Sequence, residues 1–203
     1  PHLPGDAGHG LGDGAAPALA VTGTSTLRYG AGISTDISAG SFTLGAGAAL
    51  TLDTGTNTVT WSNGLGTAGN ASLIKAGTGI LVLSAASTYT GGTTLRGGSL
   101  VLEHAGALGP DGTLAFTGSA TLRYAAGMTT DLSNRFAPIS AGANATLDLN
   151  GNTVSFAAGL AGPGAFTKIG AGTLSLTKPG TLAGGLTLAA GRLVLGDNAA
   201  LGT

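Results

Sequence analysis

Short alternations of apolar and polar residues recur along the chain at a nearly constant spacing. Each alternation has the form apolar-x-apolar and is bounded by Gly, Asn or Ser, as in Leu50-Thr51-Leu52 and Leu100-Val101-Leu102. A two-residue period over three to five residues is typical of a half-buried β-strand. The spacings between successive predicted strands are 24, 22, 21 and 20 residues, and the strands begin near Thr26, Leu50, Ser72, Thr93 and Thr113.

This spacing selects one all-β architecture. An up-and-down barrel requires strands of about eight residues or more joined by hairpins, and the predicted strands are too short for it. A coil of 20 to 24 residues with three short strands and three turns is the unit of a β-solenoid. Because stacked coils are about 4.8 Å apart, the sequence predicts a three-faced parallel solenoid of roughly eight or nine coils, about 40 Å long.

The chain also consists of two copies of one long unit. Residues 26–65 and 121–160 are identical at 20 of 40 aligned positions, and residues 75–109 and 168–202 at 17 of 35. The units span approximately residues 11–108 and 109–203. Self-similarity over this length indicates a repeat architecture. We therefore expect residues 1–203 to be a single β-helix section of a larger protein.

The composition excludes several classes of function. Charged residues make up 8% of the chain and the formal net charge is -1, so no electrostatic field is available to attract nucleic acid. The absence of cysteine excludes disulfide scaffolds, thiolate metal sites and thiol nucleophiles. No run of 18 apolar residues is present, and we expect no membrane insertion by this section. The sequence indicates no cofactor and no metal site.

The shorter of the two internal similarities, between residues 75–109 and 168–202, resembles a known motif. The pattern Lys75-x-Gly77-x-Gly79-x-Leu81-x-Leu83, followed by the segments 88–95 and 98–102, is similar to the autotransporter-associated β-strand repeat. This motif is also called the passenger-associated transport repeat of Gram-negative type V secretion proteins. The second copy has Leu182-Ala183 where the family favours Tyr-Thr. The signature positions are Lys75, Gly77, Gly79, Leu81, Leu83, Gly91, Gly92, Leu95, Gly98, Leu100 and Leu102 in the first copy, and Lys168, Gly170, Gly172, Leu174, Leu176, Gly184, Gly185, Leu188, Gly191, Leu193 and Leu195 in the second.

The resemblance implies a right-handed parallel β-helix that is exported through the periplasm and outer membrane to the cell surface. Its partner would be a C-terminal outer-membrane β-barrel of the same polypeptide, which is not in this chain. In the family, such repeats lie in the stalks of adhesins and surface proteases and are linked to efficient export. The leading hypothesis is a non-catalytic, secretion-promoting stalk that folds coil by coil outside the cell and presents a functional domain N-terminal to it.

Three other functions are compatible with a solenoid. The chain could be an adhesive surface that binds host surface molecules or a like passenger, and Arg28, Tyr29, Arg123 and Tyr124 are its candidate glycan contacts. A carbohydrate-active enzyme is disfavoured because no compact acid-base cluster is evident. An ice-binding solenoid is disfavoured because Thr-x-Thr pairs occur irregularly.

The remaining conspicuous residues receive structural interpretations. Gly91-Gly92 is expected to form a turn, because a strand and not a helix follows it. The paired aspartates Asp36/Asp131 and Asp53/Asp148 are expected to accept hydrogen bonds in turns. Lys75 and Lys168 are expected to extend over a turn toward solvent. Trp61 and Phe156 occupy the same position in the two units and are expected in the core.

Overall fold

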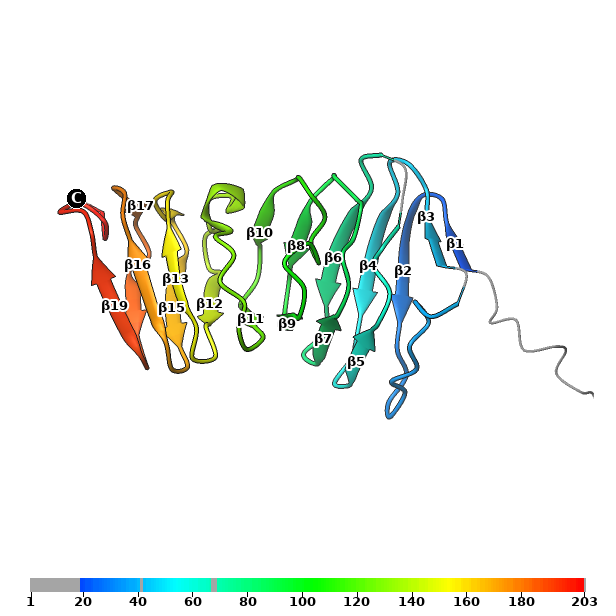
Figure 1. Cartoon of the computed structure of the whole chain (residues 1–203). Helices are drawn as coiled ribbons and strands as arrows, with labels where there is room; N and C mark the ends of the chain where they lie inside the picture. Colours follow the sequence, from blue (N-terminus) through cyan, green and yellow to red (C-terminus); the bar gives the residue numbers. More distant parts are fainter. Residues whose placement is uncertain (1–18, 41, 67–68, 203) are drawn as a thin grey trace, which may run out of the picture.

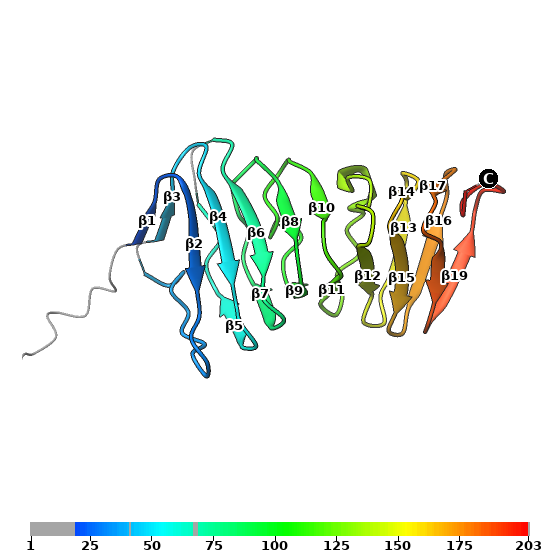
Figure 2. The ribbon, with the colours of Figure 1, turned by 180° about the vertical axis from the view of Figure 1, so that it is seen from behind.

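The computed structural model describes residues 19–40, 42–66 and 69–202. These residues form an elongated stack of coils whose order follows the sequence from one end to the other (Figures 1 and 2). Every strand pair is parallel, with partners roughly one coil apart in sequence. The described residues contain no α-helix, and the short 3-10 helix η1 (Ser133–Arg135) interrupts one coil. The predicted all-β parallel solenoid of about eight coils is confirmed.

Three faces enclose the core. The first is a five-stranded sheet of β2 (Thr24–Arg28), β4 (Ala49–Asp53), β6 (Ser72–Ala76), β8 (Thr93–Leu95) and β10 (Leu114–Phe116). The second is a seven-stranded sheet of β5 (Thr58–Trp61), β7 (Ile80–Leu83), β9 (Gly98–Leu102), β11 (Ala120–Tyr124), β12 (Asn144–Asp148), β15 (Ala165–Ile169) and β18 (Leu186–Leu188). The third contains β13 (Thr153–Phe156), β16 (Thr173–Leu176) and β19 (Arg192–Leu195).

Two short strand pairs complete the coils at the ends of the stack. Chain order places the pair β1 (Leu19–Val21) and β3 (Phe42–Leu44) on the third face of the first coils. It places the pair β14 (Ala161–Gly162) and β17 (Thr181–Leu182) on the first face of the last coils. In the middle of the stack, residues 84–92 and 103–113 connect the second face to the first without a regular strand.

Inward side chains form ladders along the stack. On the second face, one ladder runs from strand to strand in register through Val59, Leu81, Leu100, Leu122, Leu147, Lys168 and Leu188. The first five of these residues are at most 1% exposed. Full burial of a Leu side chain contributes about 1.5–3 kcal/mol. One coil cannot bury its own leucines, so the stack is the unit of stability.

The second unit is turned by one face relative to the first. Strands β2, β4, β6 and β8 of the first unit correspond in sequence to β11, β12, β15 and β18. The first set lies on the first face, and the second set lies on the second face. The 95-residue offset thus equals four coils and one additional face, not a whole number of coils. Equivalent surfaces of the two units consequently point in different directions.

Candidate functional site

The signature leucines of the first copy lie inside the stack. Leu81, Leu83, Leu100 and Leu102 are at most 2% exposed. In the second copy Leu174 and Leu176 are equally buried, whereas Leu188 and Leu195 lie in the last described coil and are 47% and 52% exposed. The glycine pair Gly91-Gly92 immediately precedes β8, and the carbonyl of Gly92 accepts a hydrogen bond from the Leu73 amide in the preceding coil.

Lys75 is placed differently from the expectation that it extends over a turn toward solvent. It is the fourth residue of β6, alternates inward after Leu73, and is fully buried. Its ammonium donates hydrogen bonds to the carbonyls of Ala76 at 2.8 Å, Gly77 at 3.2 Å and Gly97 at 3.3 Å. The expectation failed because the polar end finds three acceptors inside a corner of the coil.

Lys168 repeats this arrangement in the second unit. Its side chain is fully buried, and its ammonium donates to the carbonyls of Ile169 at 3.0 Å, Gly170 at 2.9 Å and Ala190 at 3.2 Å. Burial lowers the pKa of both lysines, to about 8 for Lys75, and a nearby aspartate partly offsets the shift.

The neighbouring aspartates are Asp53 and Asp148, at the ends of β4 and β12. The Asp53 carboxylate accepts a hydrogen bond from the Gly55 amide at 2.8 Å and pairs with the Arg28 guanidinium at 3.5 Å. Asp148 repeats the pattern and pairs with Arg123 at 3.4 Å. These pairs lie at the surface, where an ion pair contributes about 0–1 kcal/mol. Each aspartate therefore accepts hydrogen bonds in a turn, as expected.

The tyrosines proposed as glycan contacts point into the stack. Tyr29 is 6% exposed and Tyr124 is fully buried. The Tyr124 hydroxyl donates to the Thr130 carbonyl at 3.0 Å, and the Tyr29 hydroxyl accepts a hydrogen bond from the Trp61 indole at 3.0 Å. Burial raises the pKa of both phenols. Because the rings are enclosed, they present no face on which a sugar could stack, and only Arg28 and Arg123 remain exposed.

Asp36 links two successive coils. One carboxylate oxygen accepts hydrogen bonds from the amide and hydroxyl of Ser38, at 2.9 and 2.6 Å, and the other accepts from the amide and hydroxyl of Ser62, at 2.9 and 2.5 Å. Partial burial alone would raise the pKa of this carboxyl, but the four hydrogen bonds together lower it. Asp131 accepts the equivalent backbone hydrogen bonds in the second unit.

Arg135 donates hydrogen bonds to four backbone carbonyls, an interaction that was not predicted from the sequence. It is the last residue of η1, and its guanidinium donates to the carbonyls of Leu108 at 2.8 Å, Gly109 at 3.0 Å, Asp111 at 2.7 Å and Gly112 at 2.9 Å. These carbonyls belong to the joint between the two units. The only available signal was the substitution of Arg at a position occupied by Gly40 in the first unit.

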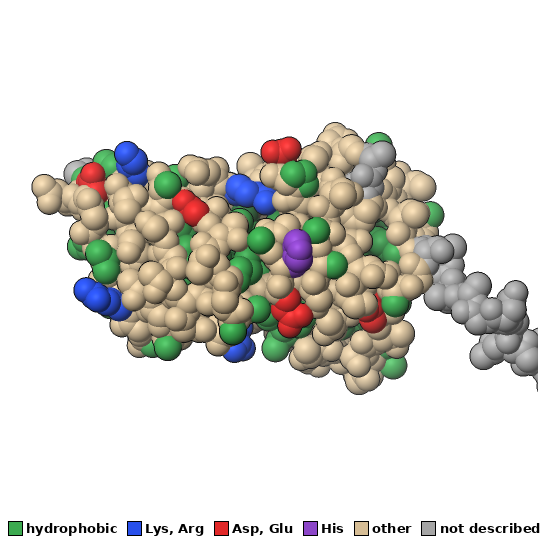
Figure 3. Space-filling view, in the orientation of Figure 1, with side chains coloured by type: hydrophobic (Ala, Val, Ile, Leu, Met, Phe, Trp, Pro, Cys, Tyr) green, Lys and Arg blue, Asp and Glu red, His purple; other side chains and the backbone are tan. Residues whose placement is uncertain are grey.

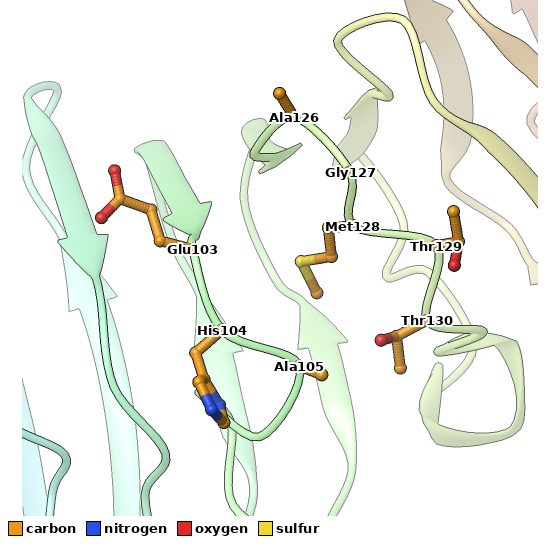
Figure 4. Close-up of a pocket in the computed structure, with 8 residues that line it drawn as sticks. All are labelled: Glu103, His104, Ala105, Ala126, Gly127, Met128, Thr129 and Thr130. Carbon is orange, nitrogen blue, oxygen red and sulfur yellow. The ribbon is translucent and has the colours of Figure 1, made fainter.

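The surface offers shallow hollows. One of about 360 Å³ lies between Glu103 and His104, which follow β9, and residues 126–130, which follow β11; the Met128 side chain lies between the two segments (Figure 4). Glu103 accepts a hydrogen bond from the Ser84 hydroxyl at 2.6 Å, and His104 accepts one from the Gly106 amide at 2.9 Å. Charged side chains are few and scattered over the face seen in Figure 3.

Two chemical features are absent from the part of the chain that the structure describes. It contains no group of three or more His, Asp or Glu side chains that could hold a metal ion. It also contains no helix that is both long and apolar enough to cross a membrane. The spacing of His2, His9 and His104 in the sequence is not that of metal ligands, and His2 and His9 lie outside the described residues.

Comparison with known proteins identifies the two repeated stretches. Residues 73–102 and 166–195 match the passenger-associated-transport-repeat family. Over 130 residues, 63% of this chain, the sequence is 39% identical to the protein named Adhesin BmaC autotransporter from Brucella suis biovar 1 (strain 1330). The chain is an autotransporter passenger region that contains passenger-associated transport repeats.

The passenger region spans about 4% of the length of this relative. No solved structure matches the chain. Passengers are exported to the cell surface, and this region is therefore an exported, cell-surface segment. The two family matches cover β6–β9 and β15–β19. Each match therefore contains one buried lysine and the backbone carbonyls that accept its hydrogen bonds.

Proposed function

We propose that this region is a non-catalytic stalk that promotes export of the passenger by folding coil by coil outside the cell. The proposal includes a functional domain presented at the N-terminal end and a C-terminal outer-membrane β-barrel of the same polypeptide through which the chain is exported. The observation that carries it is the change in burial of equivalent leucines between a covered coil and the last described coil.

The two repeats supply a matched comparison for that change. Leu95 and Leu102, which are covered by a further coil, are 0% and 1% exposed. Their equivalents Leu188 and Leu195 in the last described coil are 47% and 52% exposed. Covering about half of two leucines contributes about 1 kcal/mol for each side chain. Each added coil also forms a new row of backbone hydrogen bonds, so growth from an existing end is favourable and loss of a coil is not.

Inward and outward substitutions on the same strands test this function. Leu81→Asp with Leu100→Asp places two carboxylates in the core, and we expect surface display of the complete protein to fall at least tenfold because the coils no longer stack. The matched control is Val82→Asp with Val101→Asp, whose side chains point outward on β7 and β9. Display is measured by antibody labelling of intact cells. Equal display of the two double variants would contradict a role of coil folding in export.

A second candidate function is adhesion, because the relative is named an adhesin. The outer surface of the second face carries a column of four threonines in register, Thr121, Thr146, Thr167 and Thr187. Such a column could form many weak hydrogen bonds with a host glycan or a like passenger. Cells that display the protein with and without residues 19–202 should then differ in aggregation or adhesion. Equal values at equal display would exclude binding by this region.

A further inference from the structure

Lys75 and Lys168 are the only fully buried charged residues in the described part of the chain. Each stands in an inward ladder where its neighbours are leucines: Lys75 lies between Leu52 and Leu95, and Lys168 between Leu147 and Leu188. A Leu would fill the position without the cost of removing an ammonium from water. A buried lysine occupies this position in both units, so another contribution must offset the cost of removing its ammonium from water.

The hydrogen bonds of each lysine join two coils. Lys75 lies in the coil of β6, and two of its acceptors, the carbonyls of Ala76 and Gly77, belong to the corner that follows β6. The third acceptor, the Gly97 carbonyl, belongs to the same corner of the following coil, between β8 and β9. For Lys168 the acceptor in the following coil is Ala190. Each ammonium thus connects, through its hydrogen bonds, the corner that follows its own strand to the same corner of the following coil.

We infer that Lys75 and Lys168 set the register in which the following coil joins the stack. A slip of two residues preserves the alternation of inward and outward side chains, so apolar ladders oppose it only weakly. The same slip moves the Gly97 carbonyl by about 6.6 Å along the strand. The buried ammonium then loses its acceptor in the next coil, which is costly for a charged group.

The groups facing each lysine leave the ammonium dependent on these carbonyls. Asp53, on β4 of the preceding coil, is the nearest acid to Lys75, and it already pairs with Arg28. Arg96, in the following turn, is exposed. Around Lys168 the corresponding groups are Asp148, paired with Arg123, and the exposed Arg192. None of these groups can replace the carbonyl lost in a slipped register.

Disulfide trapping measures the register directly, because the chain has no cysteine of its own. Thr94→Cys is combined with Ile74→Cys, its partner in the native register, or with Ser72→Cys or Ala76→Cys, its partners after a two-residue slip. All four side chains point outward, and natively opposed strand residues lie within disulfide range whereas the slipped pairs lie about 8 Å apart. Each pair is oxidised while the 203-residue chain refolds from urea.

With Lys75 present, we expect the native pair to form at least ten times more disulfide than either slipped pair. In a Lys75→Met background the ratio should fall at least tenfold while the circular dichroism retains its β content, because Met preserves the apolar ladder. Lys178→Met removes an exposed lysine and should leave the ratio unchanged. An unchanged ratio in Lys75→Met would overturn the inference, as would loss of the β fold in both Lys75→Met and Lys75→Leu.

The pH dependence of register selection provides a second readout, because a side chain that only filled space in the core would not change with pH. The Lys75 pKa is lowered to about 8 from its ordinary 10.5, so the unfolded chain binds more protons between these pH values and stability rises with pH across this window. The neutral amine has only two N–H donors for three carbonyls, so register selection should weaken. At pH 10 the slipped pairs should increase in the unmodified chain but not in Lys75→Met; no increase would count against the inference. The assay involves no export, so its failure would leave the proposed stalk function intact.

Discussion

Gly98→Ala is expected to lower the free energy of unfolding by about 3–5 kcal/mol, one of the largest effects of any single methyl group in this protein. Gly98 begins β9 with a φ of +64°, a left-handed conformation that L side chains rarely adopt. An added Cβ would lie 2.6 Å from the Gly77 carbonyl oxygen and 2.8 Å from the Thr78 carbonyl carbon. Both contacts are with backbone of the preceding coil, so the two coils would have to separate at the corner that Lys75 fastens.

Gly127→Ala is the matched control for this prediction. Gly127 has a φ of +81°, but nothing lies within 4 Å of the position of an added Cβ. The substitution therefore introduces the backbone strain without the collision, and we expect a loss of about 1 kcal/mol. Urea unfolding followed by circular dichroism gives both values. Similar losses for the two variants would show that conformational strain, and not the close approach of coils, explains the need for Gly98.

The sequence was sufficient to predict the coils because their alternation and spacing are local properties. Triplets such as Leu50-Thr51-Leu52 place alternate side chains inward wherever a strand forms, and the structure buries both leucines completely. The equivalence of Trp61 and Phe156 likewise predicted core positions, and both are fully buried. These predictions required no knowledge of which strands become neighbours.

The rotation of the second unit could not be predicted in this way. Whether β11 joins the first or the second face depends on how many sides the chain completes between equivalent strands, and turns of variable length conceal that number. The residues between β11 and β12 illustrate the difficulty, because they contain η1 and complete two sides of a coil without a regular strand. A sequence repeat therefore fixes the local structure of each unit but not its orientation about the axis.

The misplaced side chains have a different cause. Lys75 follows Leu73 by two residues, so alternation alone places it inward, but its charge argued for solvent. Tyr124 also occupies an inward position of its strand, and its hydroxyl is satisfied by the Thr130 carbonyl. In each case a buried backbone acceptor removed the cost of burial, and such acceptors become visible only when the coils are stacked.

Arg135→Met is expected to lower the free energy of unfolding by about 3 kcal/mol, because it removes the donors for four backbone carbonyls at the joint between the units. Met retains an apolar stem of similar length. Arg135→Lys should lower the free energy of unfolding by less than Arg135→Met does. It should not restore the value of the unmodified chain, since an ammonium cannot reproduce the planar arrangement of donors. Arg192→Met, which removes an exposed guanidinium, is the control and should cost less than about 0.5 kcal/mol.

The same variant should also separate the unfolding of the two units. In a linear stack, cooperativity depends on the interface between neighbouring coils, and Arg135 of the second unit donates a hydrogen bond to the carbonyl of Leu108, the last residue of the first unit. Trp61 is the only tryptophan and lies in the first unit, so its fluorescence reports that unit alone, whereas circular dichroism reports both. The two probes should give coincident transitions in the unmodified chain and distinct midpoints in Arg135→Met. Coincident transitions in the variant would mean that the buried ladders, which continue through the joint without interruption, are sufficient to couple the units.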